Sequence, residues 1–156
     1  MPFLGSLDIV GSALTAENFR ANIALQNMAN AKTTVTETGD PYRRQQVVFE
    51  ERALNFQSLL TDEQRRTRLE RGQVRSGVKS GGVRVAEVVE SDRDFLSVYD
   101  PTHPQADENG YVQYPNVDTT EEMIDLMAAS NAYDVNLTAL NVVKAMIRKA
   151  LEMNNS

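Results

Sequence analysis

Apolar residues recur at helical spacing over residues 119–153, a stretch that contains neither Pro nor Gly. On a helix these residues form two seams that lie on opposite faces. The first seam contains Leu126, Tyr133, Leu137, Leu140, Ile147 and Leu151, and the second contains Ile124, Ala128, Val135, Ala139, Val142, Met146 and Met153. Polar residues separate the two seams. We therefore expect one long helix that needs two packing partners.

The ends of this stretch also favour a helix. Thr119 and Glu122 have the spacing of a capping box, and Asp118 with Glu121 is an alternative that also places carboxylates at the helix start. Basic residues gather near the other end, where they suit the helix dipole: Lys144, Arg148 and Lys149. At about 1.5 Å per residue, the helix would be about 50 Å long.

A second helical pattern covers residues 6–30 and repeats the two-seam design. One face contains Leu7, Val10, Leu14, Ala21, Leu25 and Met28, and the roughly opposite face contains Ile9, Ala13, Ala16 and Ile23. We expect Asn30 to end this helix, because Asn tolerates the left-handed conformation common at helix ends. The polar residues 32–40 then predict a loop.

Short strands are predicted in the middle of the chain, at residues 42–50, 83–90, 95–99 and 111–114. The pair Arg43-Arg44 suggests that the first of them starts in solvent. The connection between the last two strands is rich in turn formers and ends in Asn-Gly, which is typical of a hairpin. The stretch from about 52 to 82 is polar and Gly-rich, and is expected to be a flexible connection.

These patterns predict a mainly α fold with a small β insert. The helical core is expected to comprise residues 1–34 and 115–156, whose two long helices pair as an antiparallel hairpin resembling a coiled coil. Residues 35–114 would form the middle region of short antiparallel strands and loops. A chain of 156 residues is long enough for one such domain.

Composition excludes several functions. The net charge of -6 argues against a nucleic-acid partner, because phosphate contacts require a basic surface. Without Cys there is no disulfide, thiolate metal site or cysteine nucleophile. The N-terminus meets its first positive charge only at Arg20, so it does not resemble a cleaved secretory signal. No apolar run is long enough to cross a bilayer, so we expect no direct membrane insertion.

The run Asp107–Gly110 resembles the middle of an EF-hand calcium-binding loop. Aligning Gly110 with the required glycine places Gln105 where the first Asp should be and Asn116 where the bidentate Glu should be. The motif therefore fails, and no metal or other cofactor is expected.

An acid–base enzyme would have to use Asp100, His103 and Asp107. His103 is the only histidine, and it stands beside Pro104 in a predicted turn with no partnered nucleophile. A turn residue is the favoured interpretation. The sequence also lacks the nucleophile-elbow, zinc-protease, phosphate-loop and dinucleotide motifs. We therefore expect no catalytic activity.

The second seam of the long helix favours assembly with other subunits. In a single compact domain, the β insert or a helix from residues 52–75 would have to cover it. After Leu60, however, the middle region is too polar to cover a seam of this length, and an exposed apolar stripe of that size predicts self-association. A tube or ring of packed helices would bury both seams. The alternative is a monomeric helical adaptor that binds partner helices without polymerising.

Particular motifs resemble flagellar axial proteins. The sequences GSALTA at 11–16 and NMANAKTT at 27–34 have a form shared broadly by these proteins. The run at 99–118, YDPTHPQADENGYVQYPNVD, resembles the family of proximal-rod subunits among the flagellar basal-body rod proteins. Its motif residues are Tyr99, Asp100, Pro101, His103, Pro104, Asp107, Gly110, Tyr111, Tyr114, Pro115 and Asn116. The resemblance spans nearly the whole chain, except that residues 52–82 match no family pattern and Gln26-Asn27-Met28 stands where the family often has Ser-Asn-Leu.

The resemblance implies a structural subunit of the periplasmic rod in the bacterial basal body, which transmits torque. Its partners would be other flagellar rod proteins, copies of itself and the flagellar type III export apparatus. In this family the terminal segments pair as helices in the rod core and are commonly disordered before assembly. Early export substrates have a Phe followed four residues later by an apolar residue, the spacing of Phe3 and Leu7. The other interpretation is that this pair only begins the helix seam.

Overall fold

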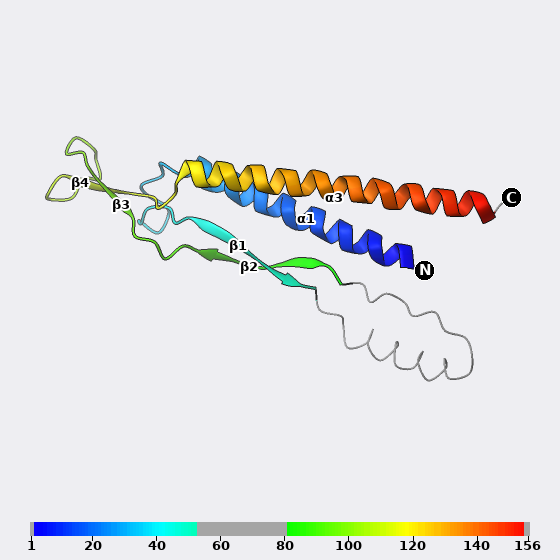
Figure 1. Ribbon diagram of the computed structural model, residues 1–156. Coiled ribbons are helices and arrows are strands. Elements are labelled where there is room, and N and C mark those ends of the chain that lie inside the picture. The colour runs from blue at the N-terminus through cyan, green and yellow to red at the C-terminus, as the bar shows by residue number, and fades with distance from the viewer. Residues whose placement is uncertain (1, 53–80, 155–156) are drawn as a thin grey trace, which may run out of the picture. The chain divides into compact units, whose positions relative to one another are not determined.

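The computed structural model describes residues 2–52 and 81–154. The elements follow in the order helix, four strands, helix, which confirms a mainly α fold with a small β insert (Figure 1). They are α1 (Pro2–Ala29), β1 (Gln45–Glu51), β2 (Val83–Glu90), β3 (Leu96–Tyr99), β4 (Tyr111–Tyr114) and α3 (Thr119–Asn154). Nearly all of the expected flexible connection at 52–82 lies outside the described residues.

Helix α1 begins at Pro2, four residues before the expected start, and Pro suits the first turn because its missing N–H is not needed there. It ends at Ala29, close to the prediction. The predicted reason was wrong, because no described residue other than Gly has a positive φ. Instead, the Asn30 N–H and Nδ2 each donate to the Gln26 carbonyl oxygen at 3.0 Å, so the last turn is closed in a right-handed conformation.

The four strands form two separate two-stranded sheets. Strands β1 and β2 are antiparallel: the Arg52 N–H donates to the Gly82 carbonyl at one end, and the Ser91 N–H donates to the Arg44 carbonyl at the other, both at 2.8 Å. Strand β1 starts three residues after the predicted Tyr42. The Tyr42 N–H donates to the Thr33 carbonyl at 3.1 Å and the Arg44 N–H donates to Asn116 Oδ1 at 2.8 Å, so neither N–H pairs with a strand. Arg44 is only 5% exposed, so the prediction that this strand starts in solvent was wrong.

Strands β3 and β4 form the predicted hairpin, with Leu96 opposite Tyr114 and Tyr99 opposite Tyr111. Asp107 organises the connecting loop, because its Oδ1 accepts hydrogen bonds from the N–H groups of Asn109 at 2.9 Å and Tyr111 at 2.8 Å. Gly110 follows with a φ of +79°, a value that favours glycine.

Of the two predicted caps at the start of α3, the structure has Asp118, the alternative to Thr119. Asp118 caps the helix, since its Oδ1 accepts the Thr120 N–H at 2.8 Å. This hydrogen bond is the main reason that the pKa of Asp118 lies below its ordinary value of 3.8. Glu122 faces the interior and is 1% exposed, so pairing it with Thr119 as a cap was wrong.

The chain forms two compact units. The first comprises Met1–Ala16, Phe49–Arg84 and Tyr133–Ser156, and the second comprises Glu17–Val48 and Val85–Ala132. In the first unit, the start of β2 lies against α1: the Val83 N–H donates to Ser12 Oγ at 3.1 Å. Asp8 of α1 also forms an ion pair with Arg52.

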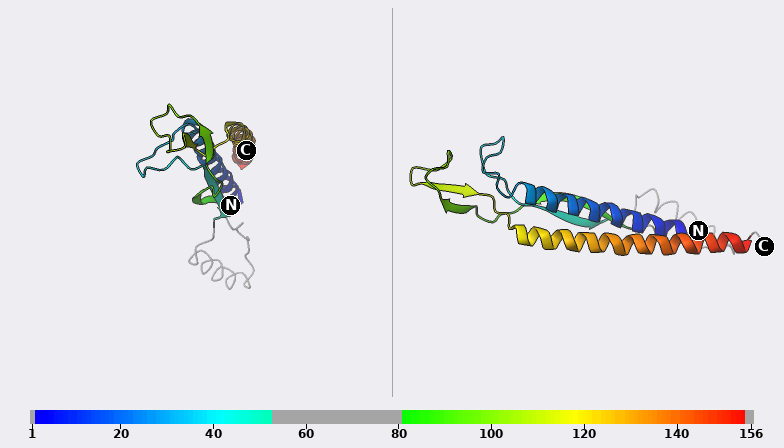
Figure 2. Two further views of the ribbon diagram at one scale, coloured as in Figure 1. Left: turned by 90° about the vertical axis from the view of Figure 1, so that its left-hand side faces the viewer. Right: turned by 90° about the horizontal axis from the view of Figure 1, so that it is seen from above.

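In the second unit, α1 and the start of α3 lie side by side and run in opposite directions (Figure 2). Asn27 is bonded to Glu122, and Arg20 is paired with Asp125, so higher numbers on one helix meet lower numbers on the other. The buried hydrophobic core of this unit is small and consists of Ile23, Ala24, Tyr42, Val112 and Ala129. Among the described helices, none is long and apolar enough to span a membrane.

Candidate assembly interface

A buried polar cluster at the centre of the second unit consists of Asn27, Tyr42, Arg44 and Glu122, and is called the Arg44 cluster below. Arg44 Nε donates to Glu122 Oε1, and Asn27 Nδ2 donates to Glu122 Oε2 at 2.8 Å. Asn27 and Glu122 are each 1% exposed. Helices α1 and α3 are thus joined by charge-assisted hydrogen bonds in the interior, where such bonds are strong and their loss is costly.

Asn27 also attaches the start of β1 to α1. Its Oδ1 accepts the Gln45 N–H at 3.0 Å and the Tyr42 hydroxyl at 2.9 Å, while its Nδ2 donates to the Gln45 carbonyl at 2.8 Å. The amide therefore satisfies the first backbone groups of the strand. Burial raises the pKa of Tyr42 above 10.0, and the nearby charges of Glu122 and Glu90 raise it further.

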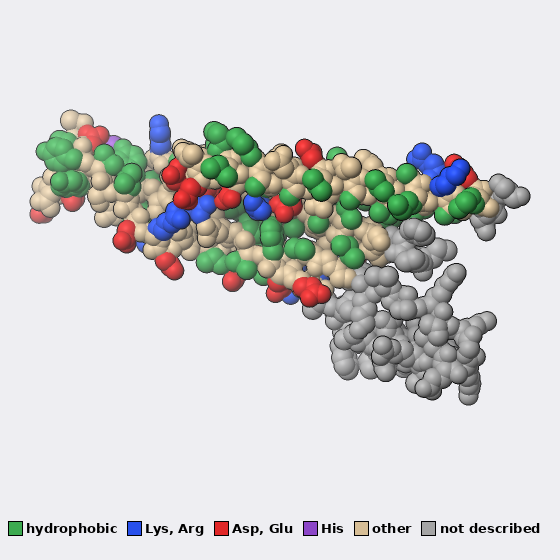
Figure 3. Space-filling model, viewed as in Figure 1, with side chains coloured by type: hydrophobic (Ala, Val, Ile, Leu, Met, Phe, Trp, Pro, Cys, Tyr) green, Lys and Arg blue, Asp and Glu red, His purple; other side chains and the backbone are tan. Residues whose placement is uncertain are grey.

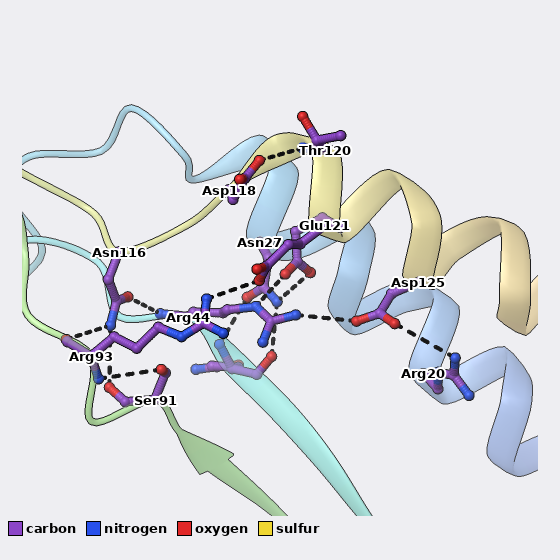
Figure 4. A network of polar contacts seen from close by, with 12 residues as sticks. Arg20, Asn27, Arg44, Ser91, Arg93, Asn116, Asp118, Thr120, Glu121 and Asp125 are labelled. Atoms are coloured by element: carbon purple, nitrogen blue, oxygen red, sulfur yellow. Dashed lines mark hydrogen bonds and ion pairs between the residues drawn. The ribbon is translucent and has the colours of Figure 1, made fainter.

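Asn116 connects the same cluster to the polypeptide around the β insert (Figure 4). Its Oδ1 accepts the Arg44 N–H at 2.8 Å, and its Nδ2 donates to the carbonyls of Ser91 at 3.2 Å and Arg93 at 2.8 Å. Arg93 in turn pairs with Glu121 at 2.9 Å. These contacts fix the point where the chain leaves the hairpin and enters α3.

Asp125 extends the Arg44 cluster toward solvent. One of its oxygens accepts from Arg44 Nη2 at 3.1 Å, and the other lies 3.7 Å from Arg20 Nη2 (Figure 4). Sequence reasoning missed the cluster because it assigned Arg44 to solvent and Glu122 to a helix cap. The available signal was Asn27, a polar residue among the apolar positions of α1.

The first predicted seam of α3 is partly covered within the chain. Four of its residues are half-buried, namely Leu126, Tyr133, Leu140 and Ile147, whereas Leu137 and Leu151 are exposed. The half-buried residues follow one another at intervals of seven, which is the spacing of a helix packed on another helix.

The second predicted seam of α3 is open. Its large residues Ile124, Val135, Val142, Met146 and Met153 are between 48% and 68% exposed, Ala128 is exposed, and only Ala139 is half-buried. Figure 3 shows apolar side chains on the outer surface of this helix. An apolar stripe with this extent of exposure marks a surface that contacts another molecule.

On α1, the predicted seams are covered to different degrees. Leu7, Val10, Leu14, Ala21 and Met28 are half-buried, and Leu25 is 49% exposed. On the roughly opposite face, Ala16 and Ile23 are buried, Ala13 is half-buried, and Ile9 is exposed. Exposed Phe19 belongs to neither predicted seam and was missed.

The family-motif residues form the hairpin and the chain that follows it. Val112 and Pro115 are buried, Tyr114 and Asn116 are half-buried, and Tyr99 and Tyr111 are exposed with their rings in edge-to-face contact at 5.4 Å. Among the loop residues, His103, Gly110 and Asp100 are half-buried, and Pro101, Pro104 and Asp107 are exposed. The motif therefore supplies both a structural loop and an exposed aromatic surface.

The polar loop residues have structural partners. His103 Nδ1 accepts the Gln105 N–H at 3.2 Å, which matches a turn residue. Asp100 Oδ1 accepts the hydroxyl of Thr102 at 2.7 Å and its N–H at 3.1 Å, and these bonds lower the pKa of Asp100. In the part of the chain that the structure describes, no three His, Asp or Glu side chains gather as a metal site would require.

The chain matches known proteins along nearly all of its length. Residues 108–153 match the family described as the C-terminal part of flagellar basal body rod FlgEFG proteins. The chain is 40% identical to the flagellar basal-body rod protein FlgC of Bacillus subtilis over 152 residues, covering 95% of both chains. It is also 40% identical to that of Salmonella typhimurium and 36% to that of Borreliella burgdorferi, covering 98% and 97% of both chains.

The helical fold and these matches define a bacterial flagellar basal-body rod protein, which is a structural subunit and not an enzyme. Within that class, the chain belongs to the FlgC family. Nothing in the comparisons favours the monomeric adaptor.

Proposed function

We propose that this chain builds the proximal rod through the second seam of α3, which is open in the single chain and is buried against neighbouring subunits. The partners are copies of this chain and other rod proteins. The observation that supports this proposal most strongly is the exposure of Val135, Val142, Met146 and Met153 on one helix.

Burial of the open seam would contribute favourable free energy to assembly. Complete burial of an aliphatic side chain is worth about 1.5–3 kcal/mol, and these four side chains are already partly covered. Burying the remainder would contribute roughly 4–6 kcal/mol per subunit before the cost of association. Every subunit in a rod would repeat this contact, so its contribution would add to those of the other contacts between subunits.

The Arg44 cluster supports torque transmission in this proposal. It joins α1, the start of β1 and the start of α3 by hydrogen bonds that are shielded from water, so relative sliding of these elements within the second unit would break several bonds together. The helical core predicted at 1–34 and 115–156 would then form the inner part of the rod, and the region 35–114 would make lateral contacts.

Export before assembly is the remaining part of the proposal. The chain would pass through the flagellar type III apparatus without inserting into the membrane, and Phe3 with Leu7 would engage the export gate. Leu7 is half-buried on α1, and the side chain of Phe3 lies outside the described residues. Normal secretion of a Phe3→Ala, Leu7→Ala variant would refute this role.

Electron microscopy of isolated basal bodies tests the location directly. A subunit with a small tag at its C-terminus is expected to add density to the proximal rod. Density at the hook or distal rod, or none in basal bodies that are otherwise intact, would contradict the proposal.

A further inference from the structure

Four of the six Met residues of this chain lie on α3 and are exposed. Met146 and Met153 are 55% and 68% exposed and stand seven positions apart on the second seam. Met123 and Met127 are 47% and 56% exposed, and both lie outside the two seams. The two pairs therefore have similar exposure in the single chain, but only the first pair would be buried through the second seam.

Exposed Met side chains are open to a specific oxidation. Hydrogen peroxide transfers one oxygen atom to the thioether sulfur: the S–O bond forms as the O–O bond of the peroxide breaks, the sulfur loses two electrons, and the other oxygen leaves as water. The product is methionine sulfoxide, a polar side chain that sulfoxide reductases convert back to Met. Because the chain contains no Cys, no thiol of its own competes for the oxidant.

The surroundings of Met146 on the helix determine what a sulfoxide would do there. Val142 stands one turn before it and carries no hydrogen-bond donor, and Lys149, one turn after it, is already paired with Glu152 at 3.4 Å. In the single chain, water can bind the sulfoxide oxygen. Against an apolar neighbour, the same oxygen would be buried without a partner, which is unfavourable.

We propose that Met146 and Met153 form an oxidation-sensitive site that controls entry into the rod. Peroxide converts them to sulfoxides in the free subunit and so hinders its incorporation, whereas burial of the seam in the rod protects them. This inference rests on the proposed rod assembly through the second seam. Reduction of the sulfoxides would make a rejected subunit usable again.

Protection is measured on the full-length chain in two states. Purified free subunit and purified basal bodies are treated with the same concentration of hydrogen peroxide, and peptide mass spectrometry follows the sulfoxide at each Met over time. We expect Met146 and Met153 to be oxidised several-fold more slowly in basal bodies than in the free subunit.

The effect on assembly is measured with Gln, which is polar, has a similar length and forms helices well. Met146→Gln, Met153→Gln imitates oxidation of the seam, and Met123→Gln, Met127→Gln is the matched control. Immunoblots of purified basal bodies should contain about tenfold less of the seam variant than of the control, because a polar group buried without a partner weakens a contact by about that factor. Circular dichroism of the purified variants verifies that both keep their helices.

A variant that cannot form sulfoxides tests the oxidation itself. Met146→Leu, Met153→Leu keeps the seam apolar and should enter the rod normally. It is produced with a different tag in the same cells as the natural sequence, so that any general effect of peroxide acts on both. Peroxide should lower the ratio of the natural sequence to the Leu variant in the rods several-fold.

Two results would overturn this inference alone: equal incorporation of the two Gln variants, or a ratio of natural sequence to Leu variant that peroxide leaves unchanged. Either result, combined with protection of Met146 and Met153 in basal bodies, would leave rod assembly through the seam intact. Equal oxidation of both residues in free subunit and basal bodies would show that the seam stays open in the rod, and would contradict the proposed function as well.

Discussion

Replacing Arg44 with Met is expected to destabilise the second unit strongly. Arg44 and Glu122 are 5% and 1% exposed, so removal of the guanidinium leaves a buried carboxylate whose remaining side-chain hydrogen bond within the described residues comes from Asn27. Breaking a buried ion pair in this way costs about 3–5 kcal/mol. That is a large share of the roughly 5–15 kcal/mol by which domains are stable.

The matched control is Arg93→Met, which removes a pair of similar chemistry at the surface of the same unit. The side chains of Arg93 and its partner Glu121 are 60% and 44% exposed. Such a pair contributes only about 0–1 kcal/mol, because water and salt screen it. The double variant Arg44→Met, Glu122→Leu should recover much of the loss, since Asn27 Nδ2 keeps its hydrogen bond to the Gln45 carbonyl.

Urea denaturation at neutral pH, followed through the tyrosine circular dichroism of the purified protein, measures these effects. The chain has no Trp, and four of its five Tyr lie in the second unit, so this signal reports mainly on that unit. Equal shifts of the midpoint for Arg44→Met and Arg93→Met would refute the role of the cluster. So would a double variant less stable than Arg44→Met alone.

The remaining predictions concern caps, titration and glycine positions. Asp118→Ala should lower the helicity of α3, whereas Thr119→Ala should not. Because the pKa of Asp118 is lowered, its contribution to the stability of the helix is complete above pH 3.8 and is lost as pH falls through the lowered pKa. Circular dichroism measured against pH will show this loss. Because the pKa of Tyr42 is raised, its contribution to the free energy of unfolding is complete below pH 10.0 and is lost as pH rises through the raised pKa. Ultraviolet absorbance should therefore show one tyrosine that ionises at a higher pH than the others, and Tyr42→Phe should remove that step. Gly110→Ala should cost about 1–2 kcal/mol or more in urea denaturation, because the residue has a φ of +79°. Gly11→Ala meets nothing within 4 Å and should instead stabilise α1 by about 0.5–1 kcal/mol; the opposite order would contradict the structure.

Helix and hairpin positions were predictable because they depend on local patterns. The apolar period over 119–153 and the Asn-Gly at the end of a polar connection each determine an element through its own residues. The bounds of α3 and β2 accordingly agree with the sequence to within one residue. The open second seam could also be predicted from local periodicity, because its exposure does not depend on contacts with distant parts of the chain.

The Arg44 cluster was not predictable in the same way, because it joins residues that are far apart in sequence. A charged residue before a strand is usually solvated, and a Glu three residues after a Thr at a helix start usually caps it. Both local rules failed because Arg44 and Glu122, separated by 78 positions, pair with each other in the interior. Asn27 hydrogen-bonds both to the Gln45 backbone at the start of β1 and to the Glu122 carboxylate on α3.

Incorporation of a Val142→Asp variant into the rod tests the central claim most directly. Val142 is 48% exposed in the single chain, so a charge there is tolerated by the fold, but it would be buried and unpaired in the proposed interface. Ser130→Asp is the matched control, because Ser130 is exposed on α3 and lies outside both seams. Immunoblots of purified basal bodies are expected to contain the Ser130→Asp subunit at the normal level and to lack the Val142→Asp subunit. Normal levels of Val142→Asp in rods of swimming cells would contradict the account.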